Sequence, residues 1–393
     1  MNAKIGEAAT LLQAEHRGSE AWWKAVARRG TPIIEQDGDM AWLTFLWRDP
    51  AGDEAQSALA RVYIDVGSVT DHHLSDPQSL ERIPKSDIWF WQLQLPAHWR
   101  GSYSFIPVSA EQLLPATDNV QRVASQRSWW RSVFEGAQPD PLNLQSPATG
   151  SWGATMSALH LPAAPQQGAW RHADAQASYC SERLQELDWN SALLANQRKV
   201  WVYQTGTVQP DSERALVLLL DGQHWAKRMP IYPALEVATE QGQLPPAVYV
   251  LIDVIDGEQR GRDLPCNAQF WLAVQNELLA LIHDLAPCSR QPERTVVAGQ
   301  SYGGLAAMYA ALHWPERFGC VLSQSGSFWW PYDELFDTPI NQAASRKPGS
   351  QGQLTEQLIG FAPATRLLKV FQEVGSREDV MIDVNETMRD ALL

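Results

Sequence analysis

The residues with the clearest chemical potential form a G-x-S-x-G motif, Gly299-Gln-Ser301-Tyr-Gly303. An apolar run, Thr295–Ala298, precedes the motif, and an amphipathic helical pattern, Gly304–Leu312, follows it. In this context the motif predicts a nucleophile elbow, where a sharp strand-to-helix turn lifts a serine hydroxyl above a sheet. We therefore predict that Ser301 is a catalytic nucleophile. A glycine-rich structural turn is the alternative.

Acyl transfer from a serine also needs two backbone N–H donors that stabilise the developing oxyanion. The elbow rule assigns the first donor to Tyr302, the residue after the nucleophile. The loop Asp221–Trp225, which follows the apolar run Ala215–Leu220, is the expected source of the second. We assign that donor to Gly222, although the sequence does not show which amide of the loop points inward. His224 is expected to shape the pocket.

The acid of a catalytic triad should follow the apolar run Leu367–Phe371, because this fold orders its triad as Ser, acid, His. We predict Glu378 as the acid, with Asp379 and Asp383 as alternatives. A serine hydroxyl also needs a general base, yet the last histidine is His313. The histidine base is thus not present in this chain. We expect the sequence to be cut short, with the base and the last strand and helix in the missing part.

The elements that must position these residues follow an α/β pattern. Continuous apolar runs, typical of strands buried on both faces, alternate with helical patterns such as Asn267–Leu285. The runs are Ala215–Leu220, Ala247–Ile252, Thr295–Ala298, Cys320–Leu322 and Leu367–Phe371. This alternation predicts a mostly parallel, doubly covered sheet. The segment Lys199–Tyr203 is expected to be an antiparallel edge strand.

The first part of the chain follows a different, all-β pattern. Short alternating or β-rich runs separated by Gly, Pro and Asp predict a small immunoglobulin-like sandwich. The expected strands are Ala41–Trp47, Ala60–Val66, Ile88–Leu95 and Gly101–Pro107. Residues 135–152 are rich in Pro, Gly, Asn and Ser, which indicates a connection between domains. We predict a sandwich domain over 1–150 and a hydrolase domain over 151–393.

Composition excludes several classes of function. The 393 residues contain 31 Lys+Arg and 45 Asp+Glu, so the net charge of −14 disfavours nucleic acid and anionic membranes as partners. No apolar run could span a bilayer, and no secretory signal is evident at the N-terminus. The four widely spaced cysteines indicate a reducing cytoplasm rather than a disulfide framework. We expect no metal site, including at Asp71-His72-His73, whose adjacent rings would point to opposite faces of a strand.

Tryptophan is unusually abundant, with 18 residues against 9 Tyr and 10 Phe. Pairs such as Trp22-Trp23 and Trp129-Trp130, and the alternating Trp89 and Trp91, fit half-buried elements. Core packing is the simpler interpretation. Stacking on a flat aromatic or sugar ligand is the functional alternative.

At the level of longer blocks, the chain resembles the enterobactin (enterochelin) esterase family from about Trp42 to Leu393. The blocks that carry the resemblance are Leu43–Pro50, Val69–His73, Trp99–Pro107, Asp140–Ser146, Leu220–Gly222 with Trp225, Leu244–Asp253, Arg260 with Asp263–Asn267, Arg294–Ser301 and His313–Ser327. So many blocks in one order are far more specific than the elbow motif alone.

The resemblance implies a sandwich domain followed by an α/β-hydrolase domain. It implies hydrolysis of the triserine lactone of ferric enterobactin to dihydroxybenzoylserine units, which releases iron in the cytoplasm. Ser301 matches the family's nucleophile, Glu378 its acid and Arg260 a substrate-binding arginine; Trp225 and His224 are expected in the same pocket. No cofactor is implied, since iron enters only as part of this small-molecule substrate. The oligomeric state stays open.

Two other functions fit the same residues. The hydrolase could act on another ester, such as a feruloylated sugar or a glucosylated siderophore. Alternatively, the chain could bind catechol siderophores without catalysis, because the family's histidine base is absent from it. Release of acylserine units would favour the esterase, and a change in Trp fluorescence without product would favour the binding protein.

Overall fold

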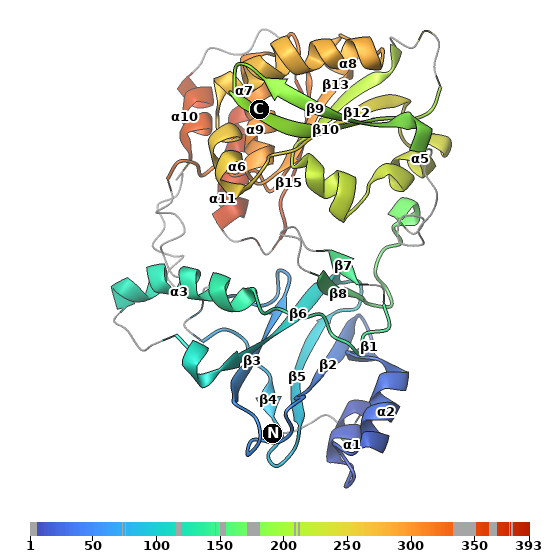
Figure 1. Cartoon of the computed structure of the whole chain (residues 1–393), viewed down its shortest axis with the longest axis vertical. Coiled ribbons are helices and arrows are strands. Elements are labelled where there is room, and N and C mark those ends of the chain that lie inside the picture. Colours follow the sequence, from blue (N-terminus) through green and yellow to red (C-terminus); the bar gives the residue numbers. More distant parts are fainter. Residues whose placement is uncertain are drawn as a thin grey trace. The chain divides into compact units, whose positions relative to one another are not determined.

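In the computed structural model the chain forms two compact units, Met1–Gln166 and Gln167–Leu393 (Figure 1). Each unit has its own buried apolar clusters. The boundary lies later than the predicted residue 150, because a strand over Thr155–His160 pairs with the sandwich. The structure describes residues 6–72, 74, 76–114, 119–145, 147–149, 155–170, 181–207, 210, 213–332, 351–360, 368–376, 378 and 380–393.

The first unit is built on two four-stranded antiparallel sheets, with strand orders β1-β2-β5-β4 and β3-β6-β8-β7. The strands are β1 (Ile33–Asp37), β2 (Met40–Arg48), β3 (Leu59–Val66), β4 (Glu81–Arg82), β5 (Ile88–Pro96), β6 (Arg100–Ser109), β7 (Ala148–Thr149) and β8 (Thr155–His160). All four predicted strands are present, as β2, β3, β5 and β6. The predicted sandwich is therefore confirmed, with β1, β4, β7 and β8 added to it.

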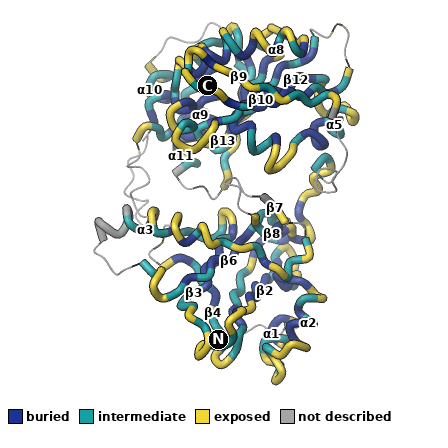
Figure 2. Tube along the Cα trace, viewed as in Figure 1, coloured by how far each residue is buried: buried dark blue, intermediate teal, exposed yellow. Residues whose placement is uncertain are grey.

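Apolar side chains from both sheets form the core of this unit. Phe45 and Trp89 from one sheet and Ile64 and Phe105 from the other belong to one buried cluster, drawn in dark blue in Figure 2. Eight of the described tryptophans are buried, and for these the simpler interpretation, core packing, holds. At the predicted histidine pair, the His72 ring stacks on Trp130 with centroids 5.4 Å apart, and His73 lies outside the described residues.

Three α-helices and a 3₁₀ turn, Ala110–Gln112, accompany the described strands of the first unit. The helices are α1 (Glu7–Gln13), α2 (Glu20–Arg29) and α3 (Asn119–Phe134). Helix α2 begins where the Ser19 side chain accepts a hydrogen bond from the Trp22 amide, and it ends at Gly30, which has a φ of 84°. Trp22 and Trp23 on this helix are buried against Ile33.

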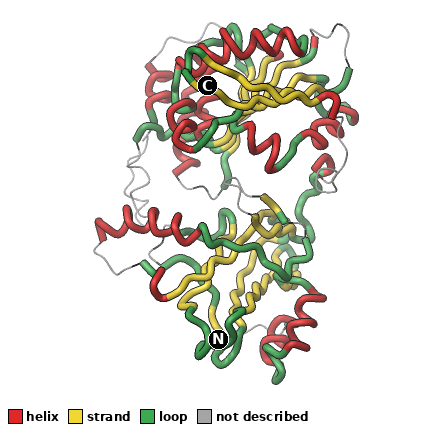
Figure 3. The backbone as a smooth tube through the Cα atoms, viewed as in Figure 1, coloured by secondary structure: helices red, strands yellow, loops and turns green. Residues whose placement is uncertain are grey.

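The second unit contains a seven-stranded sheet of order β15-β14-β13-β11-β12-β10-β9 (Figure 3). Its strands are β9 (Leu184–Ser191), β10 (Asn196–Gln204), β11 (Ala215–Leu219), β12 (Ala247–Ile252), β13 (Thr295–Gln300), β14 (Cys320–Gln324) and β15 (Lys369–Glu373). Neighbours from β12 to β15 pair in parallel, while β10 pairs antiparallel with β12 and β9. The predicted mostly parallel α/β sheet is confirmed.

One detail of the predicted sheet is wrong. The segment Lys199–Tyr203 lies in β10 and is antiparallel as predicted, but β9 pairs with its outer side and forms the edge. Strand β9 has no apolar run, and it carries Glu186 and Asp188. Such charges are typical of an edge strand, where they oppose pairing with another chain.

Helices cover both faces of this sheet. Along β10, Val202 joins one cluster together with residues of α7, α8 and α9, while Trp201 joins another cluster with residues of α5. The helices are α5 (Tyr232–Glu240), α6 (Gly257–Asp263), α7 (Ala268–Ala273), α8 (Leu279–Leu285), α9 (Tyr302–His313), α10 (Gln353–Gly360) and α11 (Val380–Leu392). The helix predicted over 267–285 consists of α7, a π-helical turn, Val274–Leu278, and α8.

Three of the four cysteines, Cys266, Cys288 and Cys320, are free thiols, and Cys180 lies outside the described residues. In the described ranges, no helix is long and apolar enough to cross a membrane. Within the same ranges, no group of three or more His, Cys, Asp or Glu side chains is arranged to hold a metal ion.

Candidate active site

Ser301 occupies a strained turn between β13 and α9. Its φ of 55° and ψ of −118° are unusual for a residue with a side chain. The surroundings hold this conformation: the Ser301 amide donates to the Gln324 carbonyl at 3.0 Å, and the Ser301 carbonyl accepts from the Leu305 amide at 3.1 Å. The turn has the geometry that the G-x-S-x-G motif predicts.

Glycine is required at one position of this turn and at one position of the loop after β11. A Cβ atom on Gly299 would lie 2.4 Å from the carbonyl carbon of Gly303, so a side chain there would push the strand and the helix apart. A Cβ atom on Gly222 would lie 2.4 Å from the backbone of Leu251 and Ile252. The close approach of the loop after β11 to strand β12 thus depends on a missing side chain.

The hydroxyl of Ser301 is available for chemistry. The residue is exposed, and its Oγ atom lies 3.1 Å from the Oγ atom of buried Ser327. Among the described residues, Ser327 provides the one hydrogen-bond partner of the Ser301 hydroxyl, and no imidazole bonds to it. The arrangement fits a nucleophile whose hydroxyl is oriented by a neighbouring serine.

Glu378 lies in the loop after β15, held in place by two hydrogen bonds. Its Oε1 atom accepts from the Ser325 hydroxyl at 2.8 Å and from the Gly375 amide at 3.0 Å. Because β13, β14 and β15 are parallel neighbours, the loops that carry Ser301, Ser325 and Glu378 leave the same edge of the sheet. Of the two alternative acids, Asp383 is exposed on α11, and Asp379 lies outside the described residues.

The two predicted oxyanion donors each open a helical segment. Tyr302 is the first residue of α9, and Gly222 begins a helical turn directly after β11. The first N–H groups of a helix have no acceptor within it, so both positions suit a backbone donor. Since β11 and β13 are parallel neighbours, both turns lie at the carboxyl edge of the sheet. The assignment of the two amides stays a prediction.

Arg260 on α6 contacts protein groups on both sides of this edge. Its Nε and Nη2 atoms donate to the two carboxylate oxygens of Asp221 at 2.6 and 2.9 Å. Nη2 also donates to the Gln300 carbonyl at 3.2 Å, and the guanidinium carbon lies 5.6 Å from the centre of the Tyr302 ring. Arg260 therefore joins the loop after β11 to the elbow. Its predicted contact with substrate is untested.

His224 and Trp225 are half-buried in the segment after β11. Burial and the nearby Arg228 guanidinium lower the pKa of His224, which favours a neutral ring near pH 7. Trp225 packs beside Tyr232 and Leu235 of α5. Their predicted place beside the elbow agrees with the parallel pairing of β11 and β13, while contact with a ligand stays a prediction.

Sequence reasoning missed Asp221 as an ion-pair partner, and Ser325 and Ser327 as hydrogen-bond partners. Ser325 and Ser327 follow β14 in a Ser-Gly-Ser sequence, and the φ of 45° at Ser325 shows that this segment also turns sharply. A small-residue cluster after a buried strand is the signal that could have marked it.

Comparisons with known proteins place the two units in one family. The family model described as "Enterochelin esterase, N-terminal" matches residues 42–170, and the model described as "Putative esterase" matches residues 191–388. The iron(III) enterobactin esterase of Dickeya dadantii is 52% identical over 393 residues, which cover 99% of this chain and 88% of the relative.

Solved structures agree over nearly the same length. The ferric enterobactin esterase of Salmonella typhimurium has a TM-score of 0.81 and 42% identity, covering 95% of this chain and 90% of that one. The enterobactin esterase of Shigella flexneri, crystallised in the presence of enterobactin, has a TM-score of 0.79 and 42% identity, covering 96% and 90%.

Proposed function

The chain belongs to the iron(III) enterobactin esterase family, and on that premise we propose that it is a serine esterase. Its substrate is ferric enterobactin, whose triserine lactone it hydrolyses to dihydroxybenzoylserine units. The observation that carries this proposal is the exposed Ser301 on its strained turn, with Glu378 at the same edge of the sheet.

The chemistry follows from this geometry. The Oγ atom of Ser301 bonds to the carbonyl carbon of a lactone ester, and the negative charge develops on the carbonyl oxygen. The amides of Tyr302 and Gly222 stabilise that charge. The ester C–O bond then breaks, and the released seryl oxygen takes up the proton that Ser301 gave up. Water hydrolyses the acyl-enzyme and restores the serine hydroxyl.

The charge of the substrate explains the residues around the elbow. A ferric tris-catecholate is a trianion with flat rings, so its site needs cations and aromatic faces. Despite the net charge of −14, the helical turn after β11 carries Trp225 and, two and three residues later, exposed Lys227 and Arg228. We propose that Trp225, His224 and Arg260 contact the substrate from these loops.

In this proposal iron enters as part of the substrate, and the chain needs no cofactor. We place the reaction in the cytoplasm, which is supported by the free thiols of Cys266, Cys288 and Cys320.

Turnover of ferric enterobactin tests the proposal. Purified protein is incubated with the ferric ligand, and dihydroxybenzoylserine is measured by chromatography, with Ser301→Ala as control. Serial release of acylserine units by the unmodified protein and none by the variant is the expected result. Quenching of Trp fluorescence by the ligand without any product would contradict the esterase function and indicate a binding protein.

A further inference from the structure

Helix α6 is a short element that local structure alone does not hold. It has seven residues, too few for a stable helix without tertiary contacts. Ile255 before it and Cys266 after it have φ values of 69° and 47°. Positive φ is a strained conformation for such residues, above all for a β-branched one. Specific contacts must therefore fix where this helix lies.

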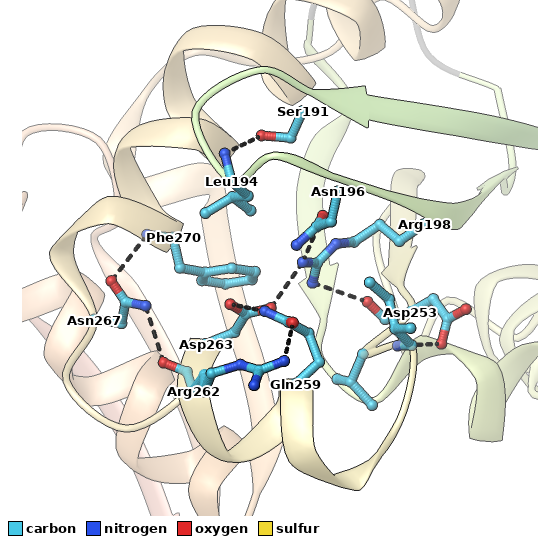
Figure 4. A network of polar contacts seen from close by, with 12 residues as sticks. Ser191, Leu194, Asn196, Arg198, Asp253, Gln259, Arg262, Asp263, Asn267 and Phe270 are labelled. Atoms are coloured by element: carbon cyan, nitrogen blue, oxygen red, sulfur yellow. Dashed lines mark hydrogen bonds and ion pairs between the residues drawn. The ribbon is translucent and has the colours of Figure 1, made fainter.

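A buried ion pair supplies the central contact (Figure 4). Arg198 on β10 donates through Nη2 to the Oδ2 atom of Asp263, the last residue of α6, at 2.7 Å. The two side chains are only 0% and 3% exposed. The Arg198 guanidinium also donates to the Asp253 carbonyl at 3.3 Å, and its carbon lies 5.6 Å from the centre of the Phe270 ring.

Further hydrogen bonds tie α6 to this pair. Gln259 donates to the Oδ1 atom of Asp263 at 2.8 Å, and the Asp256 side chain caps the helix by accepting from the Gln259 amide at 2.7 Å. At the other end, the Asn267 side chain donates to the Arg262 carbonyl at 2.9 Å (Figure 4). Both carboxylate oxygens of Asp263 are thus occupied, which fixes the rotation of α6 as well as its position.

The position of α6 decides where Arg260 points. Arg260 precedes Asp263 by one helical turn, so both side chains depend on the same rotation of the helix. The Arg260 guanidinium donates to both carboxylate oxygens of Asp221, a residue with a φ of 55°, and to the Gln300 carbonyl. Asp221 directly precedes Gly222, and Gln300 lies two residues before Tyr302; Gly222 and Tyr302 are the proposed oxyanion donors.

We propose that the Arg198–Asp263 pair and Arg260 are positioning residues for catalysis: the pair fixes α6, and Arg260 holds the two oxyanion donors at one spacing. The inference rests on the proposed function of Ser301, and it adds a role that the site residues alone do not show. Small displacements of catalytic groups have large effects on rate. Loss of the Arg198–Asp263 pair should therefore lower the rate of the chemical step.

Two variants test this link at different points. Asp263→Asn removes the charge that holds Arg198 and weakens the anchor of α6. Arg260→Lys keeps a positive charge, but an ammonium group cannot reproduce the flat fork that spans Asp221 and reaches the Gln300 carbonyl. Each variant is expected to lower kcat about tenfold to hundredfold. In Asp263→Asn, which removes no proposed substrate contact, the dissociation constant of ferric enterobactin, from Trp fluorescence, should change less than about threefold.

A second readout reports on the oxyanion site without turnover. An aryl boronic acid binds a nucleophilic serine when the Ser301 oxygen bonds to boron and the hydroxyl proton passes to solvent. The adduct that results is a tetrahedral anion with its formal charge on boron, and it places one of its hydroxyl oxygens where the two amides point. Misplaced donors should therefore weaken boronate affinity by the same tenfold to hundredfold factor in Asp263→Asn and in Arg260→Lys.

The matched control is Asp49→Asn in the first unit, which breaks another buried Arg–Asp pair. It should leave both kcat and boronate affinity unchanged, measured below its unfolding temperature. If Asp263→Asn does not fold, the result for Arg260→Lys alone tests the positioning role. Retained kcat and boronate affinity in Arg260→Lys would overturn the proposal, even if ferric enterobactin then bound more weakly, because Arg260 would act through substrate contact alone.

The two readouts also separate this inference from the proposed function. A protein that leaves enterobactin intact, yet shows the expected loss of boronate affinity in both variants, would contradict the function and support the positioning role. Hydrolysis of enterobactin by the unmodified protein, together with unchanged kcat and boronate affinity in both variants, would support the function and contradict the positioning role. A protein that does not bind boronate at all would contradict both.

Discussion

Each unit contains a buried Arg–Asp pair, and the two pairs are built alike. In the first unit, Arg82 bonds to Asp49, with side chains 12% and 0% exposed, and its guanidinium carbon lies 4.6 Å from the centre of the Trp89 ring. In the second, Arg198 bonds to Asp263 and lies 5.5 Å from the Trp189 ring. Both pairs therefore have a nearly fully buried aspartate, opposite charges in contact and a guanidinium beside a Trp ring, so these properties do not tell which pair matters for function.

The pairs differ in what they connect. Arg82 on β4 and Asp49 after β2 both belong to the sandwich, and Arg82 also donates to the carbonyls of Gly52 and Ser86. The pair of the second unit instead joins a strand to the helix that carries Arg260. A buried ion pair is therefore a functional candidate because of the element it positions, and its burial alone indicates only a structural role.

The largest expected effect concerns the nucleophile, Ser301, and would assign the chemistry to the second unit. Ser301→Ala should lower kcat for ferric enterobactin by at least about 10⁴-fold, because no other hydroxyl takes its place on the strained turn. Binding measured by Trp fluorescence should stay within about twofold. The matched control is Ser157→Ala, which removes a buried serine of the first unit and should leave kcat unchanged. Substantial hydrolysis by Ser301→Ala would refute the elbow assignment.

The acid gives the second largest effect. Glu378→Gln keeps the size of the side chain but removes the negative charge that would stabilise the proton leaving the Ser301 hydroxyl, so kcat should fall by about 10³-fold. Initial rates of acylserine release measure this loss. Asp383→Asn, at an exposed position on α11, is the matched control and should retain the normal rate. The opposite pattern would assign the acid to Asp383.

The two ion pairs should be alike in stability and different in activity. Removing one partner of a buried pair leaves an unpaired charge, so Asp49→Asn and Asp263→Asn should each cost about 3 kcal/mol of unfolding free energy. Each loss should be confined to peptides of its own unit in hydrogen exchange measured by mass spectrometry. Only Asp263→Asn should also lower kcat. Loss of protection in both units from a single variant would show that the two cores unfold together.

The sequence predicted those features that depend on a few neighbouring residues. The elbow is defined by five residues and a buried strand before them, so Ser301 could be placed from the motif. The parallel strands could be found because burial on both faces produces continuous apolar runs. Strand β9 was missed because an edge strand with Glu186 and Asp188 has no such run.

Contacts between distant residues could not be predicted in this way. Arg198 and Asp263 are separated by 65 positions, and in the sequence each resembles an ordinary surface charge. The same holds for Asp221 and Arg260, and for Ser327, whose distance to Ser301 depends on how β13 and β14 pair. A resemblance could mark Arg260 as part of a pocket, but only the fold shows what the guanidinium holds.

The smallest expected effect concerns the polar cluster of His283, Cys288 and Arg317 in the second unit, which we expect to contribute to stability and not to kcat. His283 lies between Cys288, 3.4 Å from Nδ1, and Arg317, which donates to Nε2 at 3.2 Å. Burial, with the Arg290 and Arg317 guanidinium groups, lowers the pKa of His283 to about 4. The unfolded chain takes up the proton first, near pH 6.5, so this group makes stability fall as the pH drops from about 6.5 toward 4.

His283→Gln keeps a neutral side chain that can accept from Arg317 and donate to Cys288, and it removes this titration. Allowing for solvent screening of a half-buried ring, the loss of unfolding free energy between pH 7 and pH 4.5 should be roughly 1 kcal/mol smaller in the variant. Urea unfolding at the two pH values measures the difference, and hydrogen exchange should confine it to the second unit. An identical pH dependence in both proteins would show that the His283 ring has the same pKa in the folded and the unfolded chain, which would contradict the lowered pKa. In His283→Gln, kcat should not change. The variant would thus show that a buried polar cluster in the same unit as the active site can affect stability without positioning catalytic groups.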